Sequence, residues 1–214
     1  MEEYKMLKTY KILSLLLTYP NEEIYAFLPE VNTTLLEENI INKQSRIGIG
    51  SFVDFFTKEG LANWQAHYVQ LFDYSKSASL YLFEHVHGDS KDRGQAMVDL
   101  IALYKENGLE ITRAELPDYL PMFLEFLAMQ TQEKAEELLA EIIDIVGFIY
   151  KKLEEKDNPY HYLLAAIIQI SKRKPAEARV EKMISEMPEI SIDEAYEEEP
   201  VTFGGENPCI NCKS

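Results

Sequence analysis

Apolar residues recur along this chain at the three- and four-residue spacing of amphipathic α-helices. The spacing is clearest in residues 7–17, 97–104, 120–129 and 131–155, where apolar side chains would line one face of each helix. No stretch alternates apolar and polar residues in the manner of a half-buried β-strand. The pattern therefore predicts an all-α fold, a single-domain helical bundle of roughly eight or more helices.

Prolines, glycines and capping residues set the expected ends of these helices. Pro20 ends the first helix, and the Asn107-Gly108 pair stops a later one. Thr112 and Glu115 match a capping box, because a short hydroxyl side chain and a glutamate three residues later can satisfy each other's free backbone N–H groups. The next helix is therefore expected to begin at this box.

The longest helix is expected from Thr131 to about Glu155. Asn158 followed by Pro159 is typical of a helix start, and Pro175 opens a last helix. The apolar stripe of the longest helix consists of Leu138, Ile142, Ile145, Ile149 and Leu153.

Two regions give a weaker helical pattern. Residues 22–56 hold short apolar faces, and Gly48 and Gly50 weaken the last of them because glycine lowers helix propensity. Residues 77–86, SASLYLFEHV, are expected to form a helical piece that stops near Gly88.

The character of the chain changes at Ser191. The last residues combine an acidic block, prolines and a glycine pair with few apolar residues, so they cannot easily offset the entropy lost on ordering. We therefore expect an all-helical domain in residues 1–190 and an acidic flexible tail in residues 191–214, with a lone CxxC at Cys209 and Cys212.

The charge of the chain limits its partners. A formal net charge of −16 without any run of lysines and arginines excludes a nucleic-acid-binding protein, because the surface would repel phosphates. Such a surface attracts basic partners instead. The longest apolar run, around Leu15–Leu17, is far shorter than the roughly 20 residues that span a bilayer, and the first residues do not match a secretory signal. We expect a cytoplasmic protein that is not an integral membrane protein.

The most unusual chemistry lies in residues 81–100, YLFEHVHGDSKDRGQAMVDL. His85, His87 and Asp89 superficially resemble the ligand run of metal-dependent hydrolases, but the histidine that should follow the aspartate is Ser90. Helical residues two apart also point away from each other, which disfavours a shared ion. Asp89 or Ser90 can instead cap the helix that follows.

Three classes of protein remain open from these residues. The first is a protein that recognises a peptide, and the second is a metal-dependent hydrolase that uses His85, His87 and Asp89. The third is a helical adaptor for folded partners. No nucleophile elbow and no phosphate-binding glycine loop occurs in the sequence, so a non-enzymatic role is favoured.

Longer motifs give a specific resemblance. The segment EHVHGDSKDRGQAMVDL, followed by ELPDYLPMFLEFLA, resembles the nitrate reductase assembly chaperones of the NarJ family, within the TorD/DmsD-like chaperones of molybdoenzymes. YVQLFDYSKSASLYLFEHVHGDS and the tail motif EEPVTFG with a following cysteine are also similar to that family. In the wider group this corner carries a Pro-x-Asp-His-type motif, whereas here it reads HVHGD.

The resemblance implies a TorD/NarJ-like helical bundle that acts as a dedicated chaperone and not as an enzyme. Its partner would be the catalytic (alpha) subunit of a nitrate reductase, bound through its N-terminal segment. The chaperone would keep the apo-subunit competent for insertion of bis-molybdopterin guanine dinucleotide and an iron–sulfur cluster, and keep it from its membrane partner. It would hold no cofactor itself, and molybdenum cofactor delivery proteins are candidate further partners.

Together, the residues and the resemblance suggest a binding mode. An amphipathic target helix would place apolar side chains in a groove, while the acidic surface attracts its basic residues. Histidines in the grip would make it sensitive to pH. The expected peptide-binding residues are Tyr81, Glu84, His85, His87, Asp89, Asp92 and Arg93 at a polar corner, with Tyr119, Met122, Phe123 and Phe126 as apolar contacts.

Overall fold

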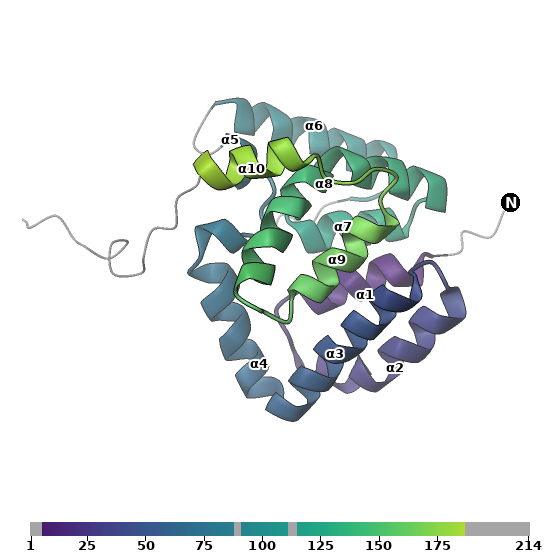
Figure 1. Cartoon of the computed structure of the whole chain (residues 1–214). Coiled ribbons are helices and arrows are strands. Elements are labelled where there is room, and N and C mark those ends of the chain that lie inside the picture. Colours follow the sequence, from purple (N-terminus) through teal and green to yellow (C-terminus); the bar gives the residue numbers. More distant parts are fainter. Residues whose placement is uncertain (1–5, 88–90, 111–114, 187–214) are drawn as a thin grey trace, which may run out of the picture.

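The regular structure of the described chain is helical, as the sequence predicts (Figure 1). The computed structural model describes residues 6–87, 91–110 and 115–186. Within these ranges it has no named strand, only an isolated antiparallel bridge, and no helix long and apolar enough to cross a membrane. The helices are α1 (Lys8–Leu17), α2 (Glu22–Glu38), α3 (Lys43–Glu59), α4 (Leu61–Tyr68), the π-helix η1 (Val69–Asp73), the 3-10 helix η2 (Lys76–Ala78), α5 (Glu84–His87), α6 (Asp92–Glu106), α7 (Leu120–Ala128), α8 (Gln132–Glu155), α9 (His161–Ile170) and α10 (Glu177–Glu186).

Helices from distant parts of the chain form the core. α1 packs against α7 as well as α2, and α9 lies between α3 and α8 (Figure 1). The core therefore joins the first and last thirds of the chain. Part of it is an aromatic cluster in which the Trp64 indole N–H donates to the Tyr160 hydroxyl at 2.7 Å and the Phe52 and Phe56 rings pack beside them.

The first helix ends where Pro20 predicts. Its amino end is capped by a residue of the next helix: the Glu38 carboxylate accepts from the backbone N–H groups of Lys8 and Thr9, at 2.7 and 2.5 Å. It also accepts from the Thr9 hydroxyl at 2.6 Å. A negative group at this position satisfies free N–H groups and matches the positive end of the helix dipole.

The weak pattern of residues 22–56 conceals two full-length helices. α2 continues through Pro29. The side chain of Asn21 caps the first turn of α2, and that of Asn42 caps the first turn of α3. The helix indicated at residues 47–56 forms as part of α3, and Gly48 within it permits close packing. A Cβ atom there would lie 2.8 Å from Cδ1 of Tyr162 on α9.

The expectation of a continuous helix through residues 77–86 is wrong. The 3-10 helix η2 ends at Ala78 and α5 begins at Glu84, and the chain between them pairs with the segment that precedes α7. The N–H of Leu82 donates to the carbonyl of Asp118 at 3.0 Å, and the N–H of Leu120 donates to the carbonyl of Leu80 at 2.8 Å. These hydrogen bonds between the two segments replace the i to i−4 bonds that a helix would make.

The start of α7 lies later than the capping box predicts. Thr112 lies outside the described residues, whereas Glu115 lies before the helix, which begins at Leu120. Pro121 occupies the first turn, where a missing N–H is tolerated. The predicted caps Asp89 and Ser90 also lie outside the described residues.

The longest helix of the described chain is α8, which begins next to Thr131 and ends at Glu155 as predicted. The Thr131 hydroxyl caps its first turn. The buried face is shifted from the expected stripe in its first half. Leu139 and Ile143 are fully buried there, whereas the predicted Leu138 and Ile142 are half-buried.

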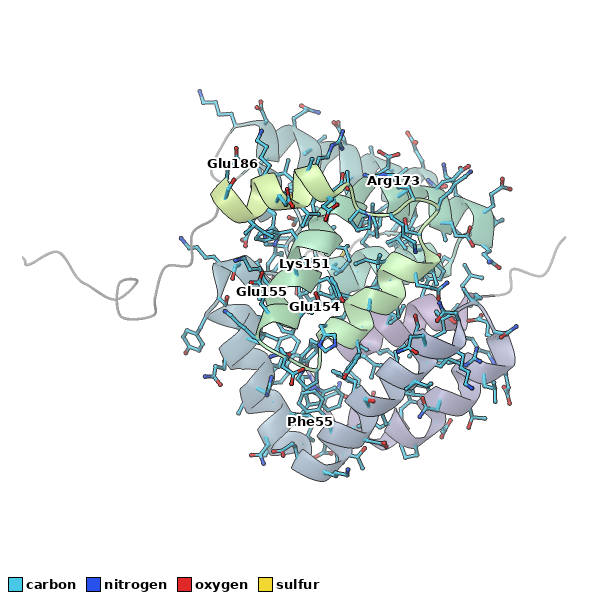
Figure 2. All side chains as sticks on the ribbon, viewed as in Figure 1. Phe55, Lys151, Glu154, Glu155, Arg173 and Glu186 are labelled. Atoms are coloured by element: carbon cyan, nitrogen blue, oxygen red, sulfur yellow. The ribbon has the colours of Figure 1, made fainter. Side chains whose placement is uncertain are left out.

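α10 is fastened to α8 by one carboxylate. Asp144 of α8 accepts two hydrogen bonds from the Arg173 guanidinium at 2.7 and 2.9 Å and one from Arg179 at 3.1 Å. The Ala176 N–H adds another at 2.8 Å. Figure 2 shows Arg173 on the connection between α9 and α10. The hydrogen bonds from Arg173 lower the pKa of Asp144 to about 2.

Candidate functional site

A pocket of about 270 Å³ opens on the surface where four segments meet. One is the connection between α1 and α2, and a second runs from α4 into η1. The other two are the paired segments before α5 and before α7. The lining residues are Tyr19, Tyr68, Phe72, Asp73, Leu80, Tyr81, Glu115 and Tyr119.

Two irregular backbone features shape the pocket. The antiparallel bridge between Tyr81 and Tyr119 brings both tyrosines to one wall, with ring centroids 5.3 Å apart. Phe72 and Asp73 come from the π-helix η1, which continues α4 with wider turns. π-helical turns are rare and occur frequently at functional sites.

The hydroxyl groups of the pocket are engaged with one another or with the chain. The Tyr68 hydroxyl donates to the carbonyl of Leu17 at 3.2 Å, so the Tyr119 hydroxyl, 2.8 Å away, donates to Tyr68. The Tyr81 hydroxyl donates to Glu115 Oε1 at 2.8 Å. Burial raises the pKa of Tyr119 to about 12, with the carboxylates of Glu115 and Asp73 adding to the rise. All of these hydroxyls stay protonated at neutral pH.

Behind the pocket, Asp118 fixes the paired segments. Its side chain is fully buried, and Oδ2 accepts from the N–H of Phe83 at 2.9 Å. Among the described residues, Oδ1 has no hydrogen-bond partner. Burial raises the pKa of this carboxyl, while the Phe83 N–H and the nearby Arg93 lower it. Asp118 therefore holds the turn that leads into α5.

The polar corner beside the pocket is built around Glu84. This carboxylate accepts from the Ser79 hydroxyl at 2.5 Å and pairs with Arg93 of α6 at 3.4 Å. His85 follows it, and the imidazole Nε2 lies 2.8 Å from the carbonyl of Ser79, so Nε2 carries the proton and donates. The ring packs against Phe148 of α8 at 5.3 Å.

This geometry does not support a metal site. The Nε2 atom of His85 is used by a backbone carbonyl, and Nδ1 is buried without a partner in the described ranges. Burial lowers the pKa of His85. No group of three histidine, cysteine, aspartate or glutamate residues within the described ranges could hold a metal ion. His87 lies in α5, but its side chain is outside the described part, as is all of Asp89.

The remaining predicted residues lie in different places. Tyr81 and Tyr119 line the pocket, and Met122 is half-buried on α7. Asp92 is exposed at the start of α6. Phe123 and Phe126 lie in the core, with 3% and 0% of their surface exposed, so a ligand at the surface cannot reach them as the chain is folded here.

Seven described residues of this region were not predicted as site residues from the sequence. They come from segments that are far apart in sequence, and the fold brings them together. Tyr68 occupies a position on an ordinary apolar helix face, so the helical pattern marks it as a core residue. The seven are Tyr19, Tyr68, Phe72, Asp73, Leu80 and Glu115, which line the pocket, and Asp118, which supports it.

Exposed apolar side chains occur on the pocket lining and on segments that continue from it. Tyr19 is 46% exposed, Leu116 46% and Val86 56%. Leu116 follows the lining residue Glu115, and Val86 belongs to α5 at the polar corner. A pocket with a polar interior and an apolar rim is suited to a partner that carries both kinds of side chain.

Comparisons with known proteins agree with each other. Residues 42–166 match the sequence profile of the family described as nitrate reductase delta subunit. The chain is 34% identical over 203 residues to the nitrate reductase molybdenum cofactor assembly chaperone NarJ of Escherichia coli (strain K12), covering 92% of this chain and 86% of that protein. It is 33% identical to the NarJ protein of Bacillus subtilis (strain 168), covering 81% and 95%.

A solved structure shows the same fold. It is the crystal structure of an Archaeoglobus fulgidus protein named for redox enzyme maturation, with a TM-score of 0.54 and 23% sequence identity. The match covers 74% of this chain and 88% of that chain. At this identity the likeness supports the helical fold alone.

Proposed function

Because this chain belongs to the nitrate reductase delta subunit family, we propose that it is a cytoplasmic assembly chaperone for the catalytic subunit of a respiratory nitrate reductase. The observation that carries the proposal is 34% identity to a NarJ chaperone over 92% of the chain. The two NarJ relatives are named as assembly chaperones and not as catalysts, which agrees with the expectation that this chain is not an enzyme.

The proposed role is to bind the N-terminal segment of the catalytic subunit. Binding keeps the apo-subunit competent to receive bis-molybdopterin guanine dinucleotide and an iron–sulfur cluster, and delays its docking at the membrane. These cofactors belong to the client. The chaperone's own contribution is a surface that holds a peptide segment reversibly.

The pocket and the polar corner together form the proposed peptide-binding surface. The pocket offers depth for one side chain, and its rim offers the apolar contacts of Tyr19, Leu116 and Val86. Glu84 and Arg93 at the corner supply one charge of each sign. Apolar anchors give affinity in such a site, and charged groups set orientation and register.

Calorimetric titration with the N-terminal peptide of the catalytic subunit tests this function. Wild-type protein should bind with a stoichiometry of about one peptide per chain and a negative heat-capacity change, since apolar surface is buried. The double variant Tyr81→Ala/Arg93→Ala should bind at least roughly tenfold more weakly, because it loses an aromatic contact and a corner charge.

The matched control is Tyr150→Ala/Lys151→Ala, which removes the same kinds of side chain from α8. Figure 2 shows Lys151 near Glu154 and Glu155 in the last turns of that helix, and neither Tyr150 nor Lys151 lines the pocket. This control should bind as the wild type does. Absence of binding by the wild-type protein would contradict the proposed function, whereas equal binding by both variants would contradict only the proposed surface.

A further inference from the structure

The pocket presents acceptors and aromatic faces but few donors. The hydroxyl protons of Tyr68, Tyr81 and Tyr119 are all given to acceptors within the chain. Glu115 uses Oε1 to accept from Tyr81 and from the N–H of Leu116. A ligand that fills this pocket must therefore bring its own hydrogen-bond donors.

Two carboxylates in the lining lack a positive partner among the described residues. Asp73 is exposed and Glu115 half-buried, and neither forms an ion pair with any residue in the described ranges. The Oε2 atom of Glu115 has no hydrogen-bond donor there either. None of the described lining residues is basic. The pocket is thus a concentration of negative charge with free acceptor atoms, on a chain that is itself strongly acidic.

Aromatic rings complete the lining. Tyr19 lies edge-on to Tyr68 at 5.6 Å, and Tyr81 lies 5.3 Å from Tyr119. The face of a tyrosine ring attracts a cation, and the attraction adds to that of nearby carboxylates. A guanidinium or ammonium group matches every property of this lining, since it brings several donors, a positive charge and no acceptor.

The size of the pocket limits what enters it. A volume of about 270 Å³ is smaller than the roughly 300–1,000 Å³ of pockets that enclose a whole drug-sized ligand. It accommodates one long side chain, with the rest of a peptide outside. The exposed rim residues Tyr19 and Leu116 are placed to contact those outer parts.

We propose that this pocket binds one arginine or lysine side chain of the client's N-terminal segment, with Asp73 and Glu115 as its carboxylate partners and Tyr19 and Tyr81 as its aromatic walls. The inference rests on the proposed function, which supplies the peptide. It adds a requirement for a basic residue, and it identifies the residues that select for it.

The test compares charged and neutral forms of the same peptide. The N-terminal peptide of the catalytic subunit is titrated beside a copy in which citrulline replaces each arginine and acetyl-lysine replaces each lysine. Wild-type protein should bind the neutral copy roughly tenfold more weakly, as expected for loss of a charged hydrogen bond in a partly exposed site. At about 0.15 M salt, where long-range attraction is screened, the variant Asp73→Asn/Glu115→Gln should lose most of the wild-type preference for the charged form.

This variant is designed to keep the fold. Glutamine at residue 115 retains an oxygen that accepts from Tyr81 and Leu116, so only charge is removed. The matched control is Glu37→Gln/Asp54→Asn, which removes the same charge from exposed positions on α2 and α3. The control should discriminate between the two peptides as the wild type does.

A second probe separates this inference from the proposed function. N-acetylarginine amide should shift the ring resonances of Tyr81 and Tyr119 in an NMR titration, whereas N-acetylcitrulline amide should not. Shifts that are seen with wild-type protein and disappear in Asp73→Asn/Glu115→Gln would support the pocket. If the client peptide did not bind while these shifts were observed, only the proposed function would be overturned. Equal peptide affinities for charged and neutral forms, or equal shifts from both amides, would overturn the inference.

Discussion

Asp118 and His85 each bury a polar atom that no described residue satisfies. An unpaired buried polar atom costs about 1–3 kcal/mol of folding free energy. The other contacts of these two side chains must offset that cost. Those contacts are the Phe83 N–H on Asp118 and the Ser79 carbonyl on His85. These contacts fix the backbone around Asp118 and His85, beside the pocket, although two polar atoms are buried without a described partner.

His85 predicts a dependence of stability on pH. Burial lowers the pKa of His85, so the unfolded chain takes up this proton more readily than the folded chain. Stability from this residue is complete above about pH 6.5, the unfolded pKa, and falls as the pH drops toward the lowered folded pKa. Denaturant unfolding between pH 7 and pH 5 should show wild-type stability declining faster than that of His85→Gln.

The decline should not vanish in that variant. Burial also lowers the pKa of His67, which lies 3.0 Å from Asn158 and contributes with the same sign. Parallel pH curves for wild type and His85→Gln would contradict the assignment to His85. Because His85 belongs to the proposed binding surface, peptide affinity should weaken as the pH falls below about 6.5 toward the lowered pKa of His85 in the folded chain, and an affinity that stays constant there would exclude a pH-sensitive grip.

At the scale of elements, the α8–α10 junction depends on Asp144. Replacing this residue with asparagine should lower the free energy of unfolding at neutral pH by about 2 kcal/mol, because the buried carboxylate loses its charge beside two arginines. A depressed carboxyl pKa stabilises the fold above the unfolded value near 4, and the effect is lost as the pH falls through about 2. The difference in free energy of unfolding between variant and wild type should therefore decrease to zero between about pH 4 and pH 2, as measured by thermal or denaturant unfolding.

An exposed ion pair supplies the comparison. Glu137 of α8 pairs with Lys172 at 2.7 Å, and both side chains are largely open to solvent. Glu137→Gln should leave stability unchanged within error, since exposed pairs are screened by water and salt. A loss equal to that of Asp144→Asn would show that burial does not govern the junction.

The helices that sequence patterns predicted well are those whose apolar residues recur regularly along one face. α1, α7 and α8 have strong apolar faces, and the structure confirms these helices. α3 was judged weak because helix propensity counts glycine as a defect, whereas Gly48 makes room for Tyr162. Residues 79–83 have helical spacing but pair with a segment almost forty residues away, and no local pattern contains that partner.

On the scale of the whole molecule, charge should control how quickly a basic client peptide arrives. A net charge of −16 steers a basic peptide toward the surface, and salt screens this attraction. The association rate of the peptide, measured by stopped-flow fluorescence, should fall by roughly tenfold or more between about 0.01 and 0.15 M salt. The dissociation rate should change much less.

The neutral copy of the peptide is the control for that experiment. Its association rate should be slow and almost independent of salt, because steering requires charge on both partners. Equal salt dependence for the two peptides would exclude steering by the acidic surface. The outcome does not depend on which residues form the pocket, so it tests the acidic surface as a whole.

Charge, fold class and the polar corner were accessible from sequence, but the pocket was not. Glu84, His85 and Arg93 are neighbours in sequence and meet in the structure. The pocket combines Tyr19 and Asp73 with Glu115, and only the complete fold brings these together. The boundary predicted at residue 190 remains a prediction, because residues 187–214 lie outside the described part.

The bridge between Tyr81 and Tyr119 has a consequence for α6. It joins the chain just before α5 to the chain just before α7. α5 and α6 therefore lie in a segment whose two ends are held together by the bridge. Of the residues of α6, all of which are described, only Tyr104 is buried, and Arg93 adds one ion pair. Opening of α6 would break the contact of Tyr104 with Phe126, at 4.8 Å, and the Arg93–Glu84 pair, but not the bridge itself. We therefore expect that a step which releases a bound peptide by loosening α6 would leave this wall of the pocket in place.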